Sequence, residues 1–177
     1  MTLLQVNNLN VTIETPNGPV EIIKKANFSL DKNDTLGIVG ESGCGKSVTA
    51  LAIMSLLPPQ SIVSGQILLE DQNLLSFNED QMCRIRGNRI GMIFQEPMTA
   101  LNPVQTIGAQ IAETLMLHKK LDKSQITARV EDLMDKVGLN VKRFPLNLYP
   151  HQLSGGQRQR VMIAMVIACR PDLLIAD

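Results

Sequence analysis

Residues 40–47, GESGCGKS, are the stretch that decides the fold, and the apolar run 35–40, TLGIVG, leads into them. The stretch fits the pattern G-x-x-x-x-G-K-S/T without a gap. The run before it predicts a β-strand, and residues 46–57, KSVTALAIMSLL, have the apolar spacing of a helix that Pro58 ends. Because strand, glycine-rich turn and helix follow in the order that the pattern needs, we predict a phosphate-binding loop rather than an ordinary turn.

The residue types in this loop suit a phosphate group. Glycines let consecutive backbone N–H groups turn inward around an anion, and the helix start adds the positive end of its dipole. Lys46 supplies a charge for the outer phosphates, and the Ser47 hydroxyl can coordinate Mg²⁺. The predicted triphosphate site consists of Gly40, Glu41, Ser42, Gly43, Cys44, Gly45, Lys46 and Ser47.

Elsewhere the chain alternates short apolar runs with segments of helical period. This alternation predicts an α/β fold with a mainly parallel sheet and a helical insertion. The long helical segment 103–139 ends at Gly138, a residue typical of a helix C-terminus. The further strands are predicted at 66–70, 89–95 and 173–177, and the last helix at 154–169.

Polar side chains stand at the ends of two predicted strands, Gln95 at one and Asp177 at the other. In open α/β sheets ligands lie beyond the carboxyl ends of the strands, where residue 40 also lies. We therefore expect Asp177 to lie where it can hold Mg²⁺ with Ser47, and Gln95 to lie at the same edge of the sheet. Taken alone, Gln95 would be interpreted as a polar strand end.

A second glycine pair occurs in LSGGQRQR, residues 153–160. Ser154 is a good N-cap, so a plain helix start is the simpler interpretation. N–H groups exposed at a helix start can also bind an anion, and the chain already has one phosphate loop upstream. Two half-sites of this kind would suit a dimer in which each chain completes the site of the other.

Composition excludes several classes of protein. Lys plus Arg and Asp plus Glu each number 17 of 177 residues, so no basic surface for nucleic acid is indicated. The longest apolar run, 161–169, is far shorter than the roughly 20 residues of a membrane span, and the N-terminus has no signal-peptide pattern. Cys44, Cys83 and Cys169 are widely spaced, so reduced thiols and a cytosolic location are expected.

LSGGQ together with GESGCGKS, with FQEP at 94–97 between them and LLIAD after them, resembles the ATP-binding subunit of an ABC transporter in motif order and spacing. The resemblance covers essentially the whole chain and implies ATP and Mg²⁺ as ligands. It implies that Lys46 and Gln95 act in catalysis and that Ser47, Gln95 and Asp177 hold the metal. The implied signature, which acts on the ATP of a partner subunit, is Leu153, Ser154, Gly155, Gly156 and Gln157.

The resemblance also implies the organisation of the domain. It predicts a P-loop NTPase core with an N-terminal antiparallel β portion and an inserted helical subdomain. Residues 1–100 would form the β portion and Walker A core, 101–152 the helical subdomain, and 153–177 the signature helix and Walker B strand. The family continues past the Walker B acid with a catalytic glutamate and a switch histidine, so we expect a partial domain without its C-terminal part and with severely reduced turnover.

Three stretches are similar to one group of importers, those of dipeptides, oligopeptides and nickel, microcin-type oligopeptide systems included: 11–18, 92–103 and 149–165. This similarity implies a subunit that powers peptide import from the cytoplasmic face of the bacterial inner membrane. Its partners would be a second ATPase subunit, identical or different, two permeases and an external solute-binding protein, with no nucleic acid. Two alternatives stay open: a non-catalytic fragment that only dimerises with intact subunits, and a soluble ABC ATPase of repair or translation, which the balanced charge disfavours.

Most members of the family stack an aromatic residue on adenine near the N-terminus, and the similarity of residues 11–18 assigns that position to Ile13. Because an aliphatic side chain has no π face, Ile13→Tyr should strengthen ATP binding by about 1–3 kcal/mol, the worth of stacking a base on an aromatic ring. A nucleotide titration of the variant and the parent measures this, and equal dissociation constants would reject the assignment.

Overall fold

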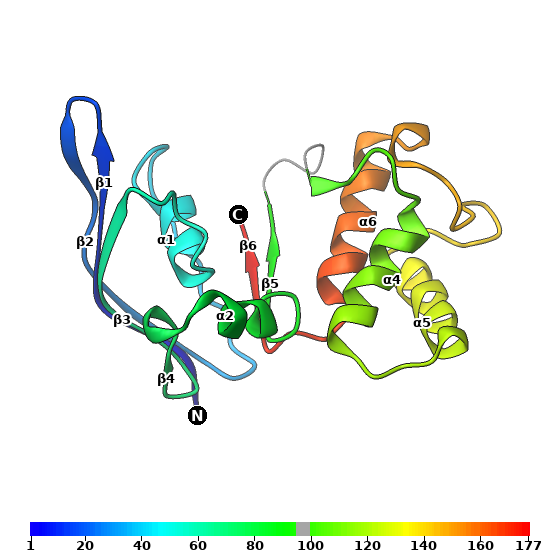
Figure 1. Ribbon diagram of the computed structural model, residues 1–177, viewed down its shortest axis with the longest axis horizontal. Helices are drawn as coiled ribbons and strands as arrows, with labels where there is room; N and C mark the ends of the chain where they lie inside the picture. The colour runs from blue at the N-terminus through cyan, green and yellow to red at the C-terminus, as the bar shows by residue number, and fades with distance from the viewer. Residues whose placement is uncertain (95–99) are drawn as a thin grey trace. The chain divides into compact units, whose positions relative to one another are not determined.

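The computed structural model describes residues 1–94 and 100–177 and divides into two units (Figure 1). The first unit comprises Met1–Cys83 together with Asp177, and the second comprises Arg84–Ala176. Helix α2 (Glu79–Ile85) contains the boundary between them. Among the described residues no helix is both long and apolar enough to cross a membrane.

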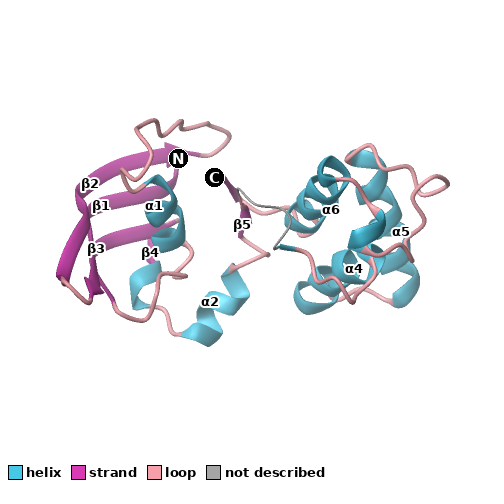
Figure 2. Ribbon diagram, turned by 90° about the horizontal axis from the view of Figure 1, so that it is seen from above, coloured by secondary structure: helices cyan, strands magenta, loops and turns pink. Residues whose placement is uncertain are grey.

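The first unit is built on a four-stranded antiparallel sheet in the order β2-β1-β3-β4, with helix α1 beside it (Figure 2). Apolar residues of β1 and β3 form its core, since Leu9, Val11, Ile67 and Leu69 are fully buried. An irregularity in β1 near Asn8 brings its carbonyl so close to Gly65 that any Cβ there would collide with it. The elements are β1 (Thr2–Thr15), β2 (Gly18–Asp31), α1 (Lys46–Ile53), β3 (Ser61–Leu69), β4 (Gln72–Asn73) and the 3-10 turn η1 (Leu74–Ser76).

The second unit combines a two-stranded parallel sheet with a block of three helices (Figures 1 and 2). Buried residues recur every three or four positions along each helix, as in Ile107, Ile111 and Leu115, so the apolar stripes meet in one core. Thr106, Asp122 and Ser154 cap the three helices at their N-termini. The elements are β5 (Ile90–Ile93), α4 (Ile107–His118), α5 (Lys123–Lys136), the 3-10 turn η2 (Pro150–Gln152), α6 (Gly155–Ile167) and β6 (Leu173–Ala176).

The expected α/β fold with an antiparallel N-terminal sheet, parallel strands and a helical insertion is confirmed. The runs 89–95 and 173–177 appear as the shorter strands β5 and β6, and 66–70 forms the end of the longer β3. Gly138 follows α5 with φ 74°, as expected of a residue that ends a helix.

The prediction of a strand at residues 35–40 is wrong. The segment has the apolar composition of a strand, but it forms none. A parallel strand exists only through hydrogen bonds to a neighbouring strand, and none of the strands in the described part of the chain pairs with residues 35–40. Leu36, Ile38 and Val39 accordingly stay 42%, 49% and 93% exposed. The helix predicted at 46–57 is also shorter, since α1 ends at Ile53.

His118, at the end of α4, makes the stability of the fold depend on pH. Burial, and then the positive charge of Lys119, lower the pKa of this imidazole below its ordinary value. A histidine whose pKa is lowered by folding contributes stability that is present above the unfolded pKa of about 6.5 and is lost as pH falls through the folded pKa. Urea unfolding at pH 7.5 and 5.5 should therefore show a smaller loss in His118→Asn than in the parent.

An equal loss of stability in His118→Asn and in the parent would contradict the role given to His118.

Candidate functional site

The loop before α1 takes a conformation that requires glycine. Gly43 and Gly45 have φ 85° and 95°, in the region that other residues rarely adopt. Gly45 is the N-cap of α1, and among the described residues no side chain caps this helix start. The loop lies tightly on β2, because a Cβ on Gly45 would be 3.4 Å from the Ile22 carbonyl oxygen. The first N–H groups of α1 are thus left for an acceptor that is not a capping side chain.

Lys46 closes this loop on itself. Its Nζ donates hydrogen bonds to the carbonyl oxygens of Gly40 and Glu41, at 2.8 and 2.7 Å, and lies 3.6 Å from the exposed Cys44 Sγ. The buried Thr49 fixes the other side of the turn, since its hydroxyl and its N–H both donate to the Gly45 carbonyl at 2.9 and 2.8 Å. The ammonium group therefore stands within the loop, where a bound phosphate would compete for it.

Ser47 and Asp177 meet although 130 positions separate them in the chain. The Ser47 hydroxyl donates to Asp177 Oδ1 at 2.9 Å, within the first unit. A hydroxyl and a carboxylate oxygen are ligands that suit Mg²⁺, which usually keeps several waters and phosphate oxygens as its other ligands. No group of three or more His, Cys, Asp or Glu that could hold a metal occurs within 1–94 and 100–177. The pair thus fits a magnesium site whose other ligands are water and phosphate oxygens better than a site made of protein ligands alone.

The segment 153–157 begins α6 in the second unit. Ser154 and Gln157 form a reciprocal capping box, in which Gln157 Oε1 accepts from the Ser154 N–H at 2.8 Å. Leu153 is buried in the core of the helical block, only 4% exposed, so its side chain anchors the segment.

Gly155 and Gly156 differ from the glycines of the first loop. Both are exposed, neither has a positive φ, and a Cβ on either would meet no described atom within 4 Å. Glycine within a helix costs up to about 1 kcal/mol relative to alanine. The described part of the chain thus gives no packing reason for a glycine at either position.

Arg158 is a residue that the sequence analysis missed, because an arginine on a predicted helix is by default a solvated surface charge. Its Nε donates to the carbonyl oxygens of Pro150 and Leu153 at 2.7 and 3.1 Å, and so ties the preceding turn to α6. Helical side chains point back toward the helix N-terminus, and this direction was the signal that could have found the contact. Arg160 makes a longer contact, 3.5 Å, from its guanidinium to the Val137 carbonyl.

The remaining predicted residues are placed as follows. Ile13 is half-buried in β1, where it pairs with Val20 of β2 and Ser61 of β3. Glu41 and Ser42 are exposed in the loop. Gln95 lies outside the described residues. The structure thus brings together Lys46, Ser47 and Asp177 within one unit and holds 153–157 in the other.

Residues 23–177 match the family model described as ABC transporter, and the chain therefore belongs to the ABC transporter family. The oligopeptide transport ATP-binding protein AppD of Bacillus subtilis is 48% identical over 99% of this chain and 54% of its own length. The oligopeptide transport ATP-binding protein OppD of Escherichia coli is 46% identical over 99% of this chain and 52% of its own length. The chain spans about half the length of these curated relatives.

Solved structures give the same classification. A dimeric ATP-binding cassette, MJ0796, described in a post-hydrolysis state bound to ADP and Pi, superposes with a TM-score of 0.87 at 25% identity, over 99% of this chain and 73% of its own. The cbiO1 protein of Clostridium perfringens, part of the transporter complex cbiONQ, gives 0.78 at 26% identity, over 99% of this chain and 65% of its own.

The Arg158 contact generates a prediction for the stability of the turn before α6. Arg158→Met removes the donor of two carbonyls, so it should lower the free energy of unfolding by about 1–3 kcal/mol and speed amide exchange in residues 150–154. Urea unfolding and hydrogen exchange measure the two effects. Arg160→Met is the matched control on the same helix, and an equal effect of both changes would contradict the special role of Arg158.

Proposed function

We propose that the chain is the ATP-binding subunit of an ABC transporter that binds and hydrolyses ATP with Mg²⁺ to power import of peptides. The observation that carries this proposal is the helix start at Gly45, which lacks a capping side chain among the described residues and stands beside Lys46 and the Ser47–Asp177 pair. A magnesium–triphosphate complex needs three elements: uncapped backbone N–H groups, a positive charge, here Lys46, and oxygen ligands for the metal, here Ser47 and Asp177.

Each of these groups has a defined task in binding. The N–H groups at the start of α1 would donate to phosphate oxygens, and Lys46 would exchange its bonds to Gly40 and Glu41 for bonds to the outer phosphates. Ser47 and Asp177 would hold the metal, directly or through water. When bound, Mg²⁺ neutralises phosphate charge during transfer of the terminal phosphoryl group. Gln95 is proposed to position the metal or water, and Ile13 to contact adenine.

The segment 153–157 is proposed to act on ATP bound by a second ATPase subunit. The open space above Gly155 and Gly156 supports this, because a phosphate group can approach a helix start most closely where no Cβ intervenes. The similar cassette MJ0796 is a dimer, which supports a pair of cassettes as the working unit. Whether the second subunit is identical or different is left to experiment.

The transported cargo is proposed from the relatives. AppD, and OppD of two bacteria, are named as oligopeptide transport proteins, and DppD of Bacillus subtilis as a dipeptide transport protein. We extend this to peptide import, with two permeases, an external solute-binding protein and a position at the cytoplasmic face of the inner membrane. We also propose the division of the chain into 1–100, 101–152 and 153–177. The turnover of residues 1–177 alone is proposed to be low, and a steady-state ATPase assay tests this.

A titration with Mg²⁺ and a fluorescent ATP analogue tests the proposed function. Lys46→Ala should weaken binding about tenfold or more, since a charge-assisted hydrogen bond is worth about 1.5–3 kcal/mol. Ser47→Ala and Asp177→Asn should remove the dependence of binding on Mg²⁺ and leave binding without the metal nearly unchanged.

Lys24→Ala is the matched control, because Lys24 is an exposed lysine of the same unit that pairs with Glu21 at 3.1 Å. Its affinity should equal that of the parent. Unchanged affinity in Lys46→Ala would refute the proposed site.

A further inference from the structure

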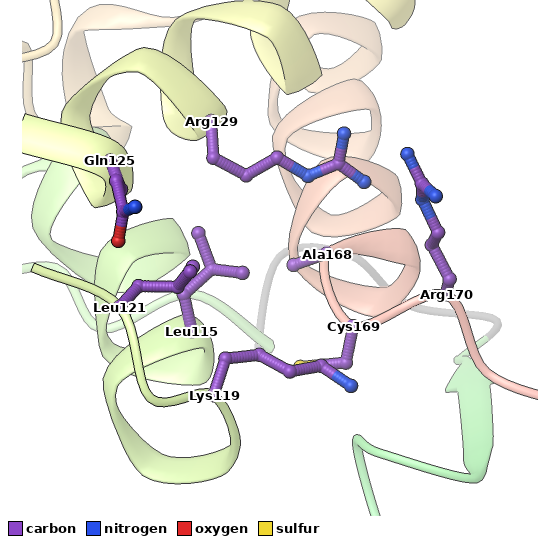
Figure 3. Close-up of a pocket in the computed structure, with 8 residues that line it drawn as sticks. All are labelled: Leu115, Lys119, Leu121, Gln125, Arg129, Ala168, Cys169 and Arg170. Atoms are coloured by element: carbon purple, nitrogen blue, oxygen red, sulfur yellow. The ribbon is translucent and has the colours of Figure 1, made fainter.

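An open cavity of about 470 Å³ lies in the second unit, and none of the residues that line it is assigned to the proposed nucleotide site (Figure 3). It lies between the end of α4, the start of α5 and the residues that follow α6. Its apolar lining comes from Leu115, Leu121 and Ala168. A volume of this size is within the range of sites that take small organic molecules.

Three cationic side chains, Lys119, Arg129 and Arg170, line this cavity, and the residues described as lining it include no carboxylate. In Figure 3 Arg129 reaches from α5 toward the end of α6, where Arg170 and Cys169 lie, and Lys119 reaches toward the same place from the end of α4. The pKa of the Cys169 thiol reports on these charges: burial raises it, and Lys119 and Arg129 each act in the opposite direction. Both cations therefore act electrostatically on the same residue of the cavity wall.

The three cations keep donors for a ligand. Lys119 Nζ donates one hydrogen bond, to Asn88 Oδ1 at 2.9 Å, and an ammonium group has three N–H donors. Arg129 binds Asp132 through NH1 at 2.7 Å and has further guanidinium N–H groups. Arg170 is exposed, and within the described parts of the chain its guanidinium makes no hydrogen bond or ion pair.

Helix dipoles account for only part of this arrangement. Lys119 and Arg170 follow the C-termini of α4 and α6, where a positive charge is favourable. Arg129, however, stands in the middle of α5. Arg170 also has φ 56°, a left-handed conformation that glycine would adopt without strain. An arginine at a position that favours glycine, opposite a mid-helix arginine, indicates that its side chain has a role in binding.

We propose that this cavity binds a small organic phosphate. Two planar guanidinium groups and one ammonium group match the oxygens of a phosphate dianion, and the apolar lining takes the organic part. Gln125, at the rim, offers a further polar group. The site lies wholly in the second unit and does not depend on the nucleotide site proposed at residues 40–47.

Calorimetric titration of the full chain with phenyl phosphate, at constant ionic strength, tests the proposal. The Lys46→Ala variant is used as the parent, so that phosphate binding by the loop at 40–47 is weakened. Binding should be one to one and tighter than that of inorganic phosphate. Arg129→Gln and Arg170→Asn should each raise the dissociation constant about tenfold, as expected for loss of a charge-assisted hydrogen bond. Asparagine is chosen at 170 because it tolerates a positive φ.

Lys120→Met is the matched control, since Lys120 is an exposed neighbour of Lys119 and does not line the cavity. Its dissociation constant should stay within about twofold of the parent, because screened surface charges contribute little. The proposal is overturned if phenyl phosphate does not bind, if it binds no better than inorganic phosphate, or if Lys120→Met weakens binding as much as Arg170→Asn. Circular dichroism of each variant establishes that it folds.

Discussion

The backbone N–H groups at the start of α1, which no described side chain caps, are the constraint around which the first unit is arranged. The N-cap is Gly45, and the described residues supply no side chain to cap the helix. Its positive φ turns the chain tightly onto β2, and Thr49 locks that turn from within the helix. Lys46 then fills the loop with its ammonium group, so the loop holds a positive charge and free donors in one small space. An anion with several oxygens satisfies this arrangement better than water does.

The start of α6, unlike that of α1, is capped by a side chain. Ser154 accepts from the Gln157 N–H within a capping box, and Arg158 holds the preceding turn, so this helix start has a side-chain cap of its own. Its two glycines remain open to the outside. The start of α1 therefore has no side-chain cap among the described residues, while the start of α6 has one and leaves its two glycines exposed. This difference agrees with a site shared between two chains, each contributing one helix start.

The sequence predicted the parts of this picture that depend on local pattern. The loop at 40–47, the cap at Ser154 and the helix end at Gly138 follow from residue type and spacing alone, and so did the helices of the second unit. The approach of Ser47 to Asp177 was also expected, but other non-local contacts could not be predicted. The segment 35–40 has the composition of a strand, yet strand formation depends on a partner elsewhere in the chain. Arg158 looked like a surface charge because nothing in its neighbours reveals which carbonyls its side chain reaches.

Sedimentation of the full chain with Mg²⁺ and ATP, combined with urea unfolding of Gly155→Ala, tests the shared site most directly. A Cβ at 155 meets no described atom within 4 Å, so the variant should be at least as stable as the parent. If the open glycines receive the phosphates of a partner chain, the parent should dimerise with Mg²⁺ and ATP and the equally stable variant should not. A variant that dimerises as well as the parent would contradict the account.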